Sequence, residues 1–309
     1  MTQVVLQPET THRPQPQRQA ILPVTGDKRR FPIEAKLALG FLVIVLAAVA
    51  VGPMLWTADP EAIDLSAKYL SPGSTTAPLG TDDYGRDILS RILHGGRLSF
   101  AGAFVVLAGS SGFGLLLGAT AGFNGGRWDA FVGRHTDVCL ALPSLVVALG
   151  IVGTLGRSFP NLILALVLTG WPWYARIYRS LVIRERGQVY VLAAHALGAS
   201  RTRILWRHIG PNILGPVLVV MTINLGNAML SLAALSFLGL GVRPPTPEWG
   251  AMVSDARFHF QTHPWLIFCP GIVISLCTLA INTLGDALRD FYDPQRYHSP
   301  RRAPRQGSR

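Results

Sequence analysis

Few side chains in this 309-residue sequence have the types and spacing needed for chemistry, and His259 and His263 are the first candidates. Their i,i+4 spacing would place both imidazoles on one face of a helix, where they could bind a metal ion. A zinc-type site needs at least a third protein ligand, and the neighbouring sequence offers none. We therefore expect no metal site here, and interpret the pair as polar residues at a membrane interface beside Trp265.

Motifs for nucleotide binding and hydrolysis are missing. The sequence has three lysines and no Gly-Lys dipeptide, so it contains no Walker A loop for the phosphates of ATP. It also lacks His-Glu-x-x-His, Gly-x-Ser-x-Gly and a cysteine pair at metal-binding spacing. We expect neither an enzyme activity nor a cofactor bound by this chain.

Three asparagines, Asn224, Asn227 and Asn282, stand in otherwise apolar stretches. Amide side chains at membrane depth face the protein interior or water, so these three could line a pathway or a gate. They could also form hydrogen bonds between helices, which is a frequent role of such residues in bundles. The sequence leaves both roles open.

Membrane helices would have to position these residues. Charged residues make up 15% of the sequence, hydrophobic residues make up 49%, and the mean hydropathy is +0.34. About 20 apolar residues cross a bilayer. We predict an all-α membrane protein with six transmembrane helices, the fourth tilted or kinked by Pro160 and Pro172. The six nearly charge-free stretches are 37–59, 98–126, 138–156, 158–175, 208–242 and 258–285.

The distribution of Lys and Arg predicts the orientation. With a cytoplasmic N-terminus, inner segments hold 21 of these residues and outer segments hold 7. Both termini should therefore be cytoplasmic. The predicted organisation is an N-terminal tail (1–36), a six-span domain (37–290) with an outer loop (57–97) and a cytoplasmic loop (176–211), and a basic C-terminal tail (291–309).

The net charge of +11 does not indicate a nucleic-acid partner, because the basic residues follow the sides of the membrane instead of clustering on one soluble face. Cys139, Cys269 and Cys277 all fall inside predicted spans. We interpret them as small buried hydrophobic residues without a disulfide framework.

Two further patterns concern helix packing. In residues 79–93, Thr81 could cap a helix, and Asp82 with Arg86 and Asp87 with Arg91 are spaced i,i+4. We predict a short amphipathic helix there, on the outer face, leading into the second span. That span carries Gly114, Gly118, Gly122 and Gly126, a small-residue face for packing either within the chain or against another subunit.

The segment 190–212 is rich in small residues and arginines and lies between two apolar stretches. Ala193, Ala194 and Ala199 would permit close approach of a partner surface. Gly198 could bend the backbone between two short helices, and Pro211 could begin the next helix. This pattern indicates a docking segment of a membrane protein.

With these features the chain resembles a permease subunit of the ATP-binding-cassette importers, in the dipeptide/oligopeptide class. That superfamily has a cytoplasmic Glu-Ala-Ala, three residues, Gly, and about ten residues later Leu-Pro. Ala193, Ala194, Gly198 and Pro211 match it, whereas Leu192 replaces the usual Glu and Gly210 the usual Leu. Motifs of the peptide class are Leu79-Gly-Thr-Asp82, Gly85-Arg-Asp-x-Leu-Ser-Arg91, Arg207-His-Ile-x-Pro-Asn212, Leu235-Ser-Phe-Leu-Gly-Leu-Gly-Val-x-Pro-Pro-Thr-Pro-x-Trp-Gly250 and Leu284-Gly-Asp-x-Leu-Arg-Asp290.

The resemblance implies a type I importer fold in the bacterial inner membrane and a C-type permease paired with a second, similar permease. It also implies two cytoplasmic ATPase subunits, which use ATP and Mg, and an extracytoplasmic binding protein. The arginines of the loop could pair with acidic groups on the ATPase or hold the loop near lipid headgroups. The residues implied to couple to the ATPase are Leu192, Ala193, Ala194, Gly198, Ala199, Ser200, Arg203 and Pro211.

Peptides are the expected cargo, and a nickel complex is the alternative within the same architecture. An ion-coupled secondary carrier would need intramembrane charges, which are scarce here. A membrane-embedded enzyme would need a clustered acid/base or metal set, which the sequence does not offer.

Overall fold

The apolar stretches become helices in the computed structural model, which describes residues 32–292. One-turn 3-10 helices at Leu65–Ala67 and Arg257–His259 accompany them, and a π-helical turn, Ile204–Ile209, joins α7 to α8. The helices are α1 (Ile33–Leu55), α2 (Ile88–Asn124), α3 (Gly126–Ala141), α4 (Ser144–Leu155), α5 (Phe159–Arg186), α6 (Val189–Ala196), α7 (Arg201–Arg203), α8 (Gly210–Phe237), α9 (Trp249–Ala256) and α10 (Trp265–Tyr292).

Four helices among the described residues are long and apolar enough to cross a membrane: α1, α2, the continuous helix Arg201–Phe237 and α10. The pair α3 and α4 would make a fifth span, although its two halves meet at 89°. Helix α5 has 28 residues but falls outside this set. The all-helical membrane architecture is therefore confirmed, and the count of six spans stays a prediction.

The small-residue face of α2 packs within the chain. A Cβ at Gly114 would lie 2.9 Å from the carbonyl oxygen of Trp171 in α5, and one at Gly122 would lie 2.7 Å from that of Arg179. The glycines thus let two backbones approach closely, which confirms the intramolecular alternative. Gly126 does not belong to this face, because it begins α3 with a φ of +62° and has open space around it.

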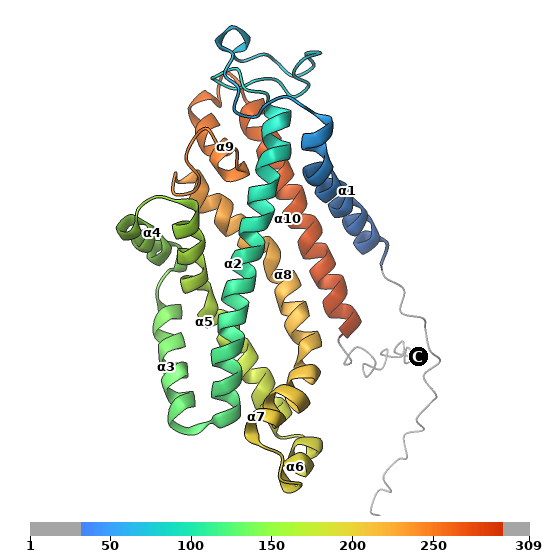
Figure 1. Cartoon of the computed structure of the whole chain (residues 1–309), viewed down its shortest axis with the longest axis vertical. Coiled ribbons are helices and arrows are strands. Elements are labelled where there is room, and N and C mark those ends of the chain that lie inside the picture. Colours follow the sequence, from blue (N-terminus) through green and yellow to red (C-terminus); the bar gives the residue numbers. More distant parts are fainter. Residues whose placement is uncertain (1–31, 293–309) are drawn as a thin grey trace, which may run out of the picture. The chain divides into compact units, whose positions relative to one another are not determined.

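The buried apolar residues form two clusters. One joins α2, α5 and α8 to α4 and to the inner side of α6. The other joins α1, α2, α9 and α10. Figure 1 shows α2 running along the bundle between these groups, with α9 and the loop before α2 at one end and α6 and α7 at the other.

Three local predictions were wrong. Residues 79–87 form turns instead of an amphipathic helix, and α2 begins at Ile88, capped by Asp87 and not by Thr81. The bounds of the outer loop (57–97) stay a prediction. The predicted span 138–156 is broken at residues 142 and 143, because Pro143 cannot continue α3.

Pro211 lies in the first turn of α8, which agrees with the prediction, and α8 itself is part of the longer continuous helix Arg201–Phe237. The cytoplasmic loop is shorter than predicted, since α5 extends to Arg186 and α7 begins at Arg201. Tyr292 ends α10, and the rest of the predicted C-terminal tail, with residues 1–31, lies outside the described residues.

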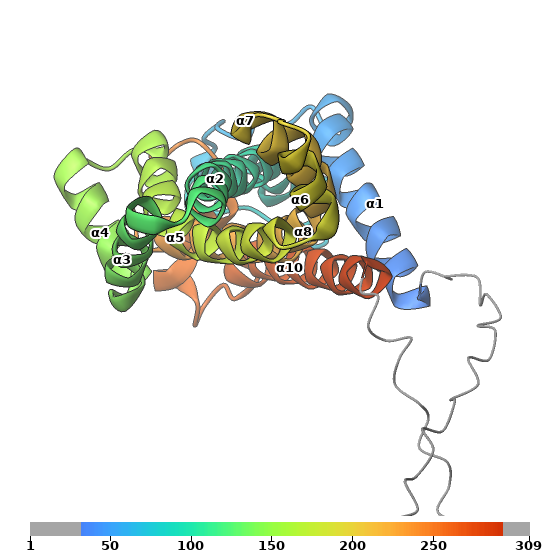
Figure 2. The same cartoon turned by 90° about the horizontal axis from the view of Figure 1, so that it is seen from below.

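The described ends of the chain point in the same direction along the bundle. The first turn of α1 and the last turn of α10 point toward the end that carries α6 and α7, away from the loop before α2 (Figure 1). Figure 2, seen from that end, places α3 and α4 on the side of the bundle opposite α1.

Candidate functional site

Helix α6 ends in a glycine-dependent turn that sets the direction of the segment 189–203. The N–H of Ala199 donates to the carbonyl of Ala194 (3.1 Å), and that of Gly198 donates to the carbonyl of His195 (3.0 Å). This is a Schellman motif, whose C′ residue must adopt a left-handed conformation. Gly198 does so with a φ of +77°, which confirms the predicted bend between two short helices.

The next helix begins with a side-chain cap, because Ser200 Oγ accepts a hydrogen bond from the N–H of Arg203 (3.4 Å). The π-helical turn follows, and there the N–H of Gly210 donates to the carbonyl of Leu205. Asn212 Nδ2 donates to the carbonyl of His208 (2.9 Å). Residues 201–203 are thus continuous with α8, whereas α6 is joined to them by the turn at Gly198.

The two faces of α6 differ. Val191 and Ala194 face the first buried cluster, and Ala194 is only 9% exposed. Leu192 and Leu197 face outward and are 60% and 89% exposed. The expectation that Ala194 meets a partner surface is therefore wrong: its small side chain permits packing of α6 on its own chain.

Positive charge surrounds this apolar tip. Arg201, Arg203 and Arg207 are exposed, and none of them forms an ion pair with another described residue. Tyr190 donates from its hydroxyl to Glu185 Oε2 (3.0 Å), and burial raises the pKa of that hydroxyl. The surface at residues 189–203 is thus an apolar centre with a basic rim.

A second feature is a cavity of about 350 Å³ among α2, α4, α5 and α8. Asn224 and Asn227 of α8 line it, and Asn227 Nδ2 donates to Asn224 Oδ1 (3.3 Å). Its other lining residues are Val106, Ser110, Leu140, Ser144, Leu145, Leu166, Thr169, Gly170, Trp173, Tyr174, Ala228 and Ser231. The wall mixes aliphatic and aromatic side chains with hydroxyl and amide groups, and no residue in it is charged.

Asn282 lies elsewhere. It belongs to α10 and packs against Gly226 of α8, where a Cβ would collide with its Oδ1 atom. That oxygen is buried without a hydrogen-bond partner. The structure therefore brings two of the three predicted asparagines to one cavity and gives Asn282 a position between α8 and α10.

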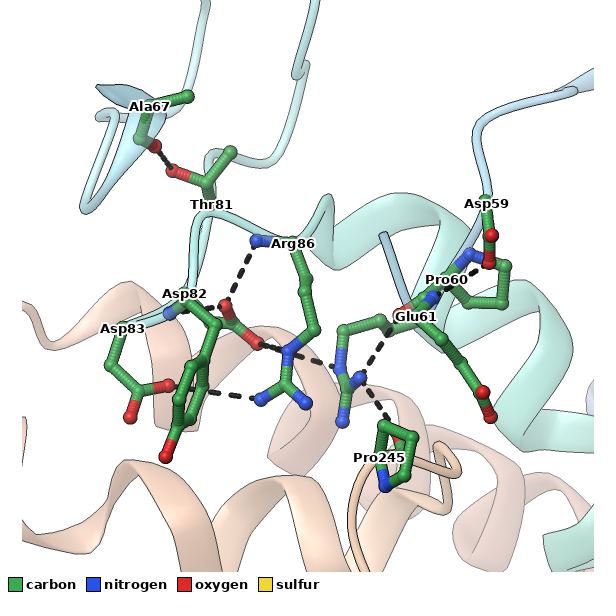
Figure 3. Close-up of polar contacts among 11 residues, drawn as sticks. Asp59, Pro60, Glu61, Ala67, Thr81, Asp82, Asp83, Arg86 and Pro245 are labelled. Atoms are coloured by element: carbon green, nitrogen blue, oxygen red, sulfur yellow. Dashed lines mark hydrogen bonds and ion pairs between the residues drawn. The ribbon is translucent and has the colours of Figure 1, made fainter. Parts of the chain in front are cut away.

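Buried charges join the outer loop to α2. Arg86 Nε lies 2.7 Å from Asp82 Oδ2, and Arg86 Nη2 lies 3.7 Å from Asp83 Oδ1 (Figure 3). Arg91 Nη1 donates to the carbonyls of Pro60 and Pro245, both at 3.0 Å. The predicted pair Asp82 and Arg86 is confirmed. The predicted pair Asp87 and Arg91 does not form, because Asp87 caps α2. Arg91 Nε lies 3.6 Å from Asp82 Oδ2 instead.

The two peptide-class motifs at 85–91 and 235–250 meet at this end, which the sequence analysis did not predict. Trp249 is fully buried and donates from Nε1 to the carbonyl of Ile92 (2.9 Å). Glu248 is also fully buried, accepts from Ser99 Oγ (2.8 Å) and caps α9. The sequence could have indicated this cap, because Glu248 precedes Trp-Gly at the start of a helix, and acidic residues are frequent N-caps.

The histidine pair has aromatic neighbours. The His263 ring stacks on that of Tyr69, with centroids 4.1 Å apart, and His259 lies near the Tyr69 hydroxyl (3.4 Å). Within residues 32–292, no group of three His, Cys, Asp or Glu side chains is placed to hold a metal ion.

Comparison with known proteins agrees with this architecture. Residues 114–296 match the family described as "Binding-protein-dependent transport system inner membrane component". The chain is 40% identical over 260 residues to the nickel transport system permease protein NikC of Escherichia coli K12, covering 84% of this chain and 93% of the relative. It is also 40% identical to the dipeptide transport system permease proteins DppC of Alkalihalophilus pseudofirmus (264 residues; 84% and 86%) and Haemophilus influenzae (266 residues; 84% and 90%).

Proposed function

Because this chain belongs to the family of binding-protein-dependent transport system inner membrane components, we propose that it is one permease subunit of an ATP-driven importer of short peptides. Family membership makes it a multi-pass protein of the bacterial inner membrane and a permease, not an ATPase. The observation that carries the proposal is the match of relatives named as dipeptide permeases over 84% of the chain.

The cavity offers groups that suit a peptide cargo. A relative named as a nickel permease is as similar as the dipeptide permeases, so identity alone does not separate the two. Asn224 and Asn227 offer neutral hydrogen-bonding groups that suit peptide amides. We assign this cavity to half of the translocation pathway.

The segment 189–203 is our candidate for the contact with a cytoplasmic ATPase. Leu192 and Leu197 would enter an apolar groove, and the basic rim with Arg203 would face acidic groups beside it. Gly198 and Ser200 fix the direction of the segment, and Ala193, Ala199 and Pro211 belong to the same connection. ATP and Mg would be used by that partner, and this chain would bind no cofactor.

For the assembly we propose the topology predicted from the charge distribution. Six spans, with α5 and the bent pair α3 and α4 each counted as one, put both termini and the segment 189–203 in the cytoplasm. A second, homologous permease would complete the pathway beside α3 and α4. Two ATPase subunits would bind on the cytoplasmic side, and a binding protein would deliver cargo at the loop before α2.

Reconstitution tests the proposal. Proteoliposomes with this chain, a second permease, the ATPases and the binding protein should take up radiolabelled alanyl-alanine only with ATP. Omission of this chain should abolish uptake, and a nickel chelate should not be accumulated. Uptake of the chelate but not the dipeptide would refute the cargo assignment. Peptide uptake that persists without the ATPases would favour an ion-coupled carrier.

A further inference from the structure

A second cavity, of about 380 Å³, lies beside helix α9. Three parts of the chain form its wall: the turn between α4 and α5, the end of α8 with the loop that follows it, and α9 itself. Cavities that bind small molecules have volumes of about 300–1,000 Å³. This one is therefore large enough for a small organic ligand.

The wall of this cavity carries charges of both signs. Arg157 lies in the turn between α4 and α5, Arg243 in the loop after α8, and Asp255 in α9. All three residues are exposed, and none of them forms an ion pair with another residue in the range 32–292. Arg243 Nη2 donates to the carbonyl of Arg157 (3.3 Å), which joins two of the three segments. We call this site the charged cavity.

Buried contacts hold the wall in place. Arg91 Nη1 donates to the carbonyl of Pro245 (3.0 Å), next to the lining residues of the loop (Figure 3). Ser254 Oγ donates to the carbonyl of Phe237 (2.7 Å), which ties α9 to the end of α8. Glu248 caps the first turn of α9. A site whose wall is already formed loses less free energy to ordering when a ligand binds.

The charged cavity is distinct from the neutral cavity lined by Asn224 and Asn227. Figure 1 places α9 at the end of the bundle opposite α6 and α7, which is the extracytoplasmic end in the proposed topology. Ser231 of α8 lines the neutral cavity and Ser236 lines the charged one, about 7.5 Å further along the helix axis. Cargo that arrives from outside would therefore reach the charged cavity first.

We propose that the charged cavity is an entry site for a short peptide with both termini free. The inference rests on the proposed function and specifies the form of the cargo. Asp255 would bind the α-ammonium group, and Arg157 and Arg243 would bind the α-carboxylate. A simple anion would be repelled by Asp255 and a simple cation by the two arginines, so a molecule with both charges fits best. Because the three side chains are exposed, binding would be weak, which suits cargo that must move on.

Photoaffinity labelling of the complete membrane assembly, without the binding protein, tests the site. The probe is a dipeptide of alanine and benzoylphenylalanine with free termini, and its adducts are mapped by mass spectrometry. We expect adducts within residues 236–255 and competition by alanyl-alanine. Its N-acetyl and C-terminal amide derivatives each lack one charge. Each should compete about two- to fivefold less well, which is the effect of one lost ion pair in contact with water.

Variants show which charge binds which terminus. In Asp255→Asn, alanyl-alanine should compete no better than its N-acetyl derivative. When Arg157→Gln and Arg243→Gln are combined, it should compete no better than its amide. Glu61→Gln and Lys68→Gln remove exposed charges of the outer loop that do not line the cavity, so competition should match wild type. All five positions are exposed, so the substitutions leave the packed core intact.

Equal competition by alanyl-alanine and its two derivatives in the wild-type assembly would overturn the inference, as would adducts confined to other segments. Weaker capture of the peptide-free binding protein by the cavity variants, with unchanged labelling by the probe, would also overturn it and make the cavity a protein-docking surface. Failure of the proposed function looks different, because the wild-type transporter, reconstituted with its binding protein, would then take up no alanyl-alanine.

Discussion

Replacing Gly118 by alanine should separate α2 from α5. A Cβ at Gly118 would lie 2.9 Å from Ala175 Cα and nearer still to its carbonyl oxygen. Carbon atoms pack best at about 3.5–4.0 Å, so the helices must part by about 1 Å. Overpacking of this kind costs about 1–3 kcal/mol. Alanine returns about 1 kcal/mol through its higher helix propensity, so the net loss should be up to about 2 kcal/mol.

Gly112 provides the control on the same helix. It has no atom within 4 Å of its Cβ position, so Gly112→Ala should be neutral or slightly stabilising. Thermal unfolding of the two purified variants in detergent measures the difference. At about 2–4 °C per kcal/mol, Gly118→Ala should unfold several degrees below wild type. Equal midpoints for both variants would refute the close packing of α2 on α5.

Three further predictions concern the outer end and the segment 189–203. Arg91→Gln should cost about 3–5 kcal/mol by breaking buried charge contacts, and faster proteolysis of the outer loop would show it; wild-type resistance would contradict this. Trp249→Phe should cost about 2–3 kcal/mol, because it removes the hydrogen bond to the carbonyl of Ile92 and leaves a cavity where the larger indole was fully buried, and an unchanged melting temperature would argue against this packing. At Gly198, with a φ of +77°, valine should reduce peptide uptake more than asparagine at equal membrane abundance, and equal uptake would remove the need for a left-handed residue.

Charge and hydropathy predicted the membrane architecture well, because both report directly on the bilayer. They identified the apolar stretches of α1, α2, α8 and α10, although α2 begins at Ile88 and not at residue 98, and α10 spans Trp265–Tyr292 and not 258–285. The break at Pro143 was not predicted, because a proline inside a membrane helix often causes only a kink. Whether the chain bends sharply there depends on the space beside α5, which is a tertiary property.

The site was predictable to the extent that its geometry is local. Gly198 and its bend follow from backbone freedom, which the sequence shows directly. The burial of Ala194 and the separation of Asn282 from Asn224 depend on which face each helix turns toward its neighbours. The contact of Arg91 with Pro245 joins residues that are 154 positions apart, and no local pattern reports such a distance.

Cross-linking at residue 197 tests the central claim, that the segment 189–203 lies in the cytoplasm against an ATPase subunit. Leu197→Cys would be introduced into the complete transporter in native membranes, with Thr75→Cys in the outer loop as the control. A cysteine at residue 197 should cross-link to an ATPase subunit and resist an impermeant thiol reagent in intact cells, whereas the one at residue 75 should react with that reagent. Labelling of residue 197 from outside, or no adduct with the ATPase when the assembly is intact, would contradict the account.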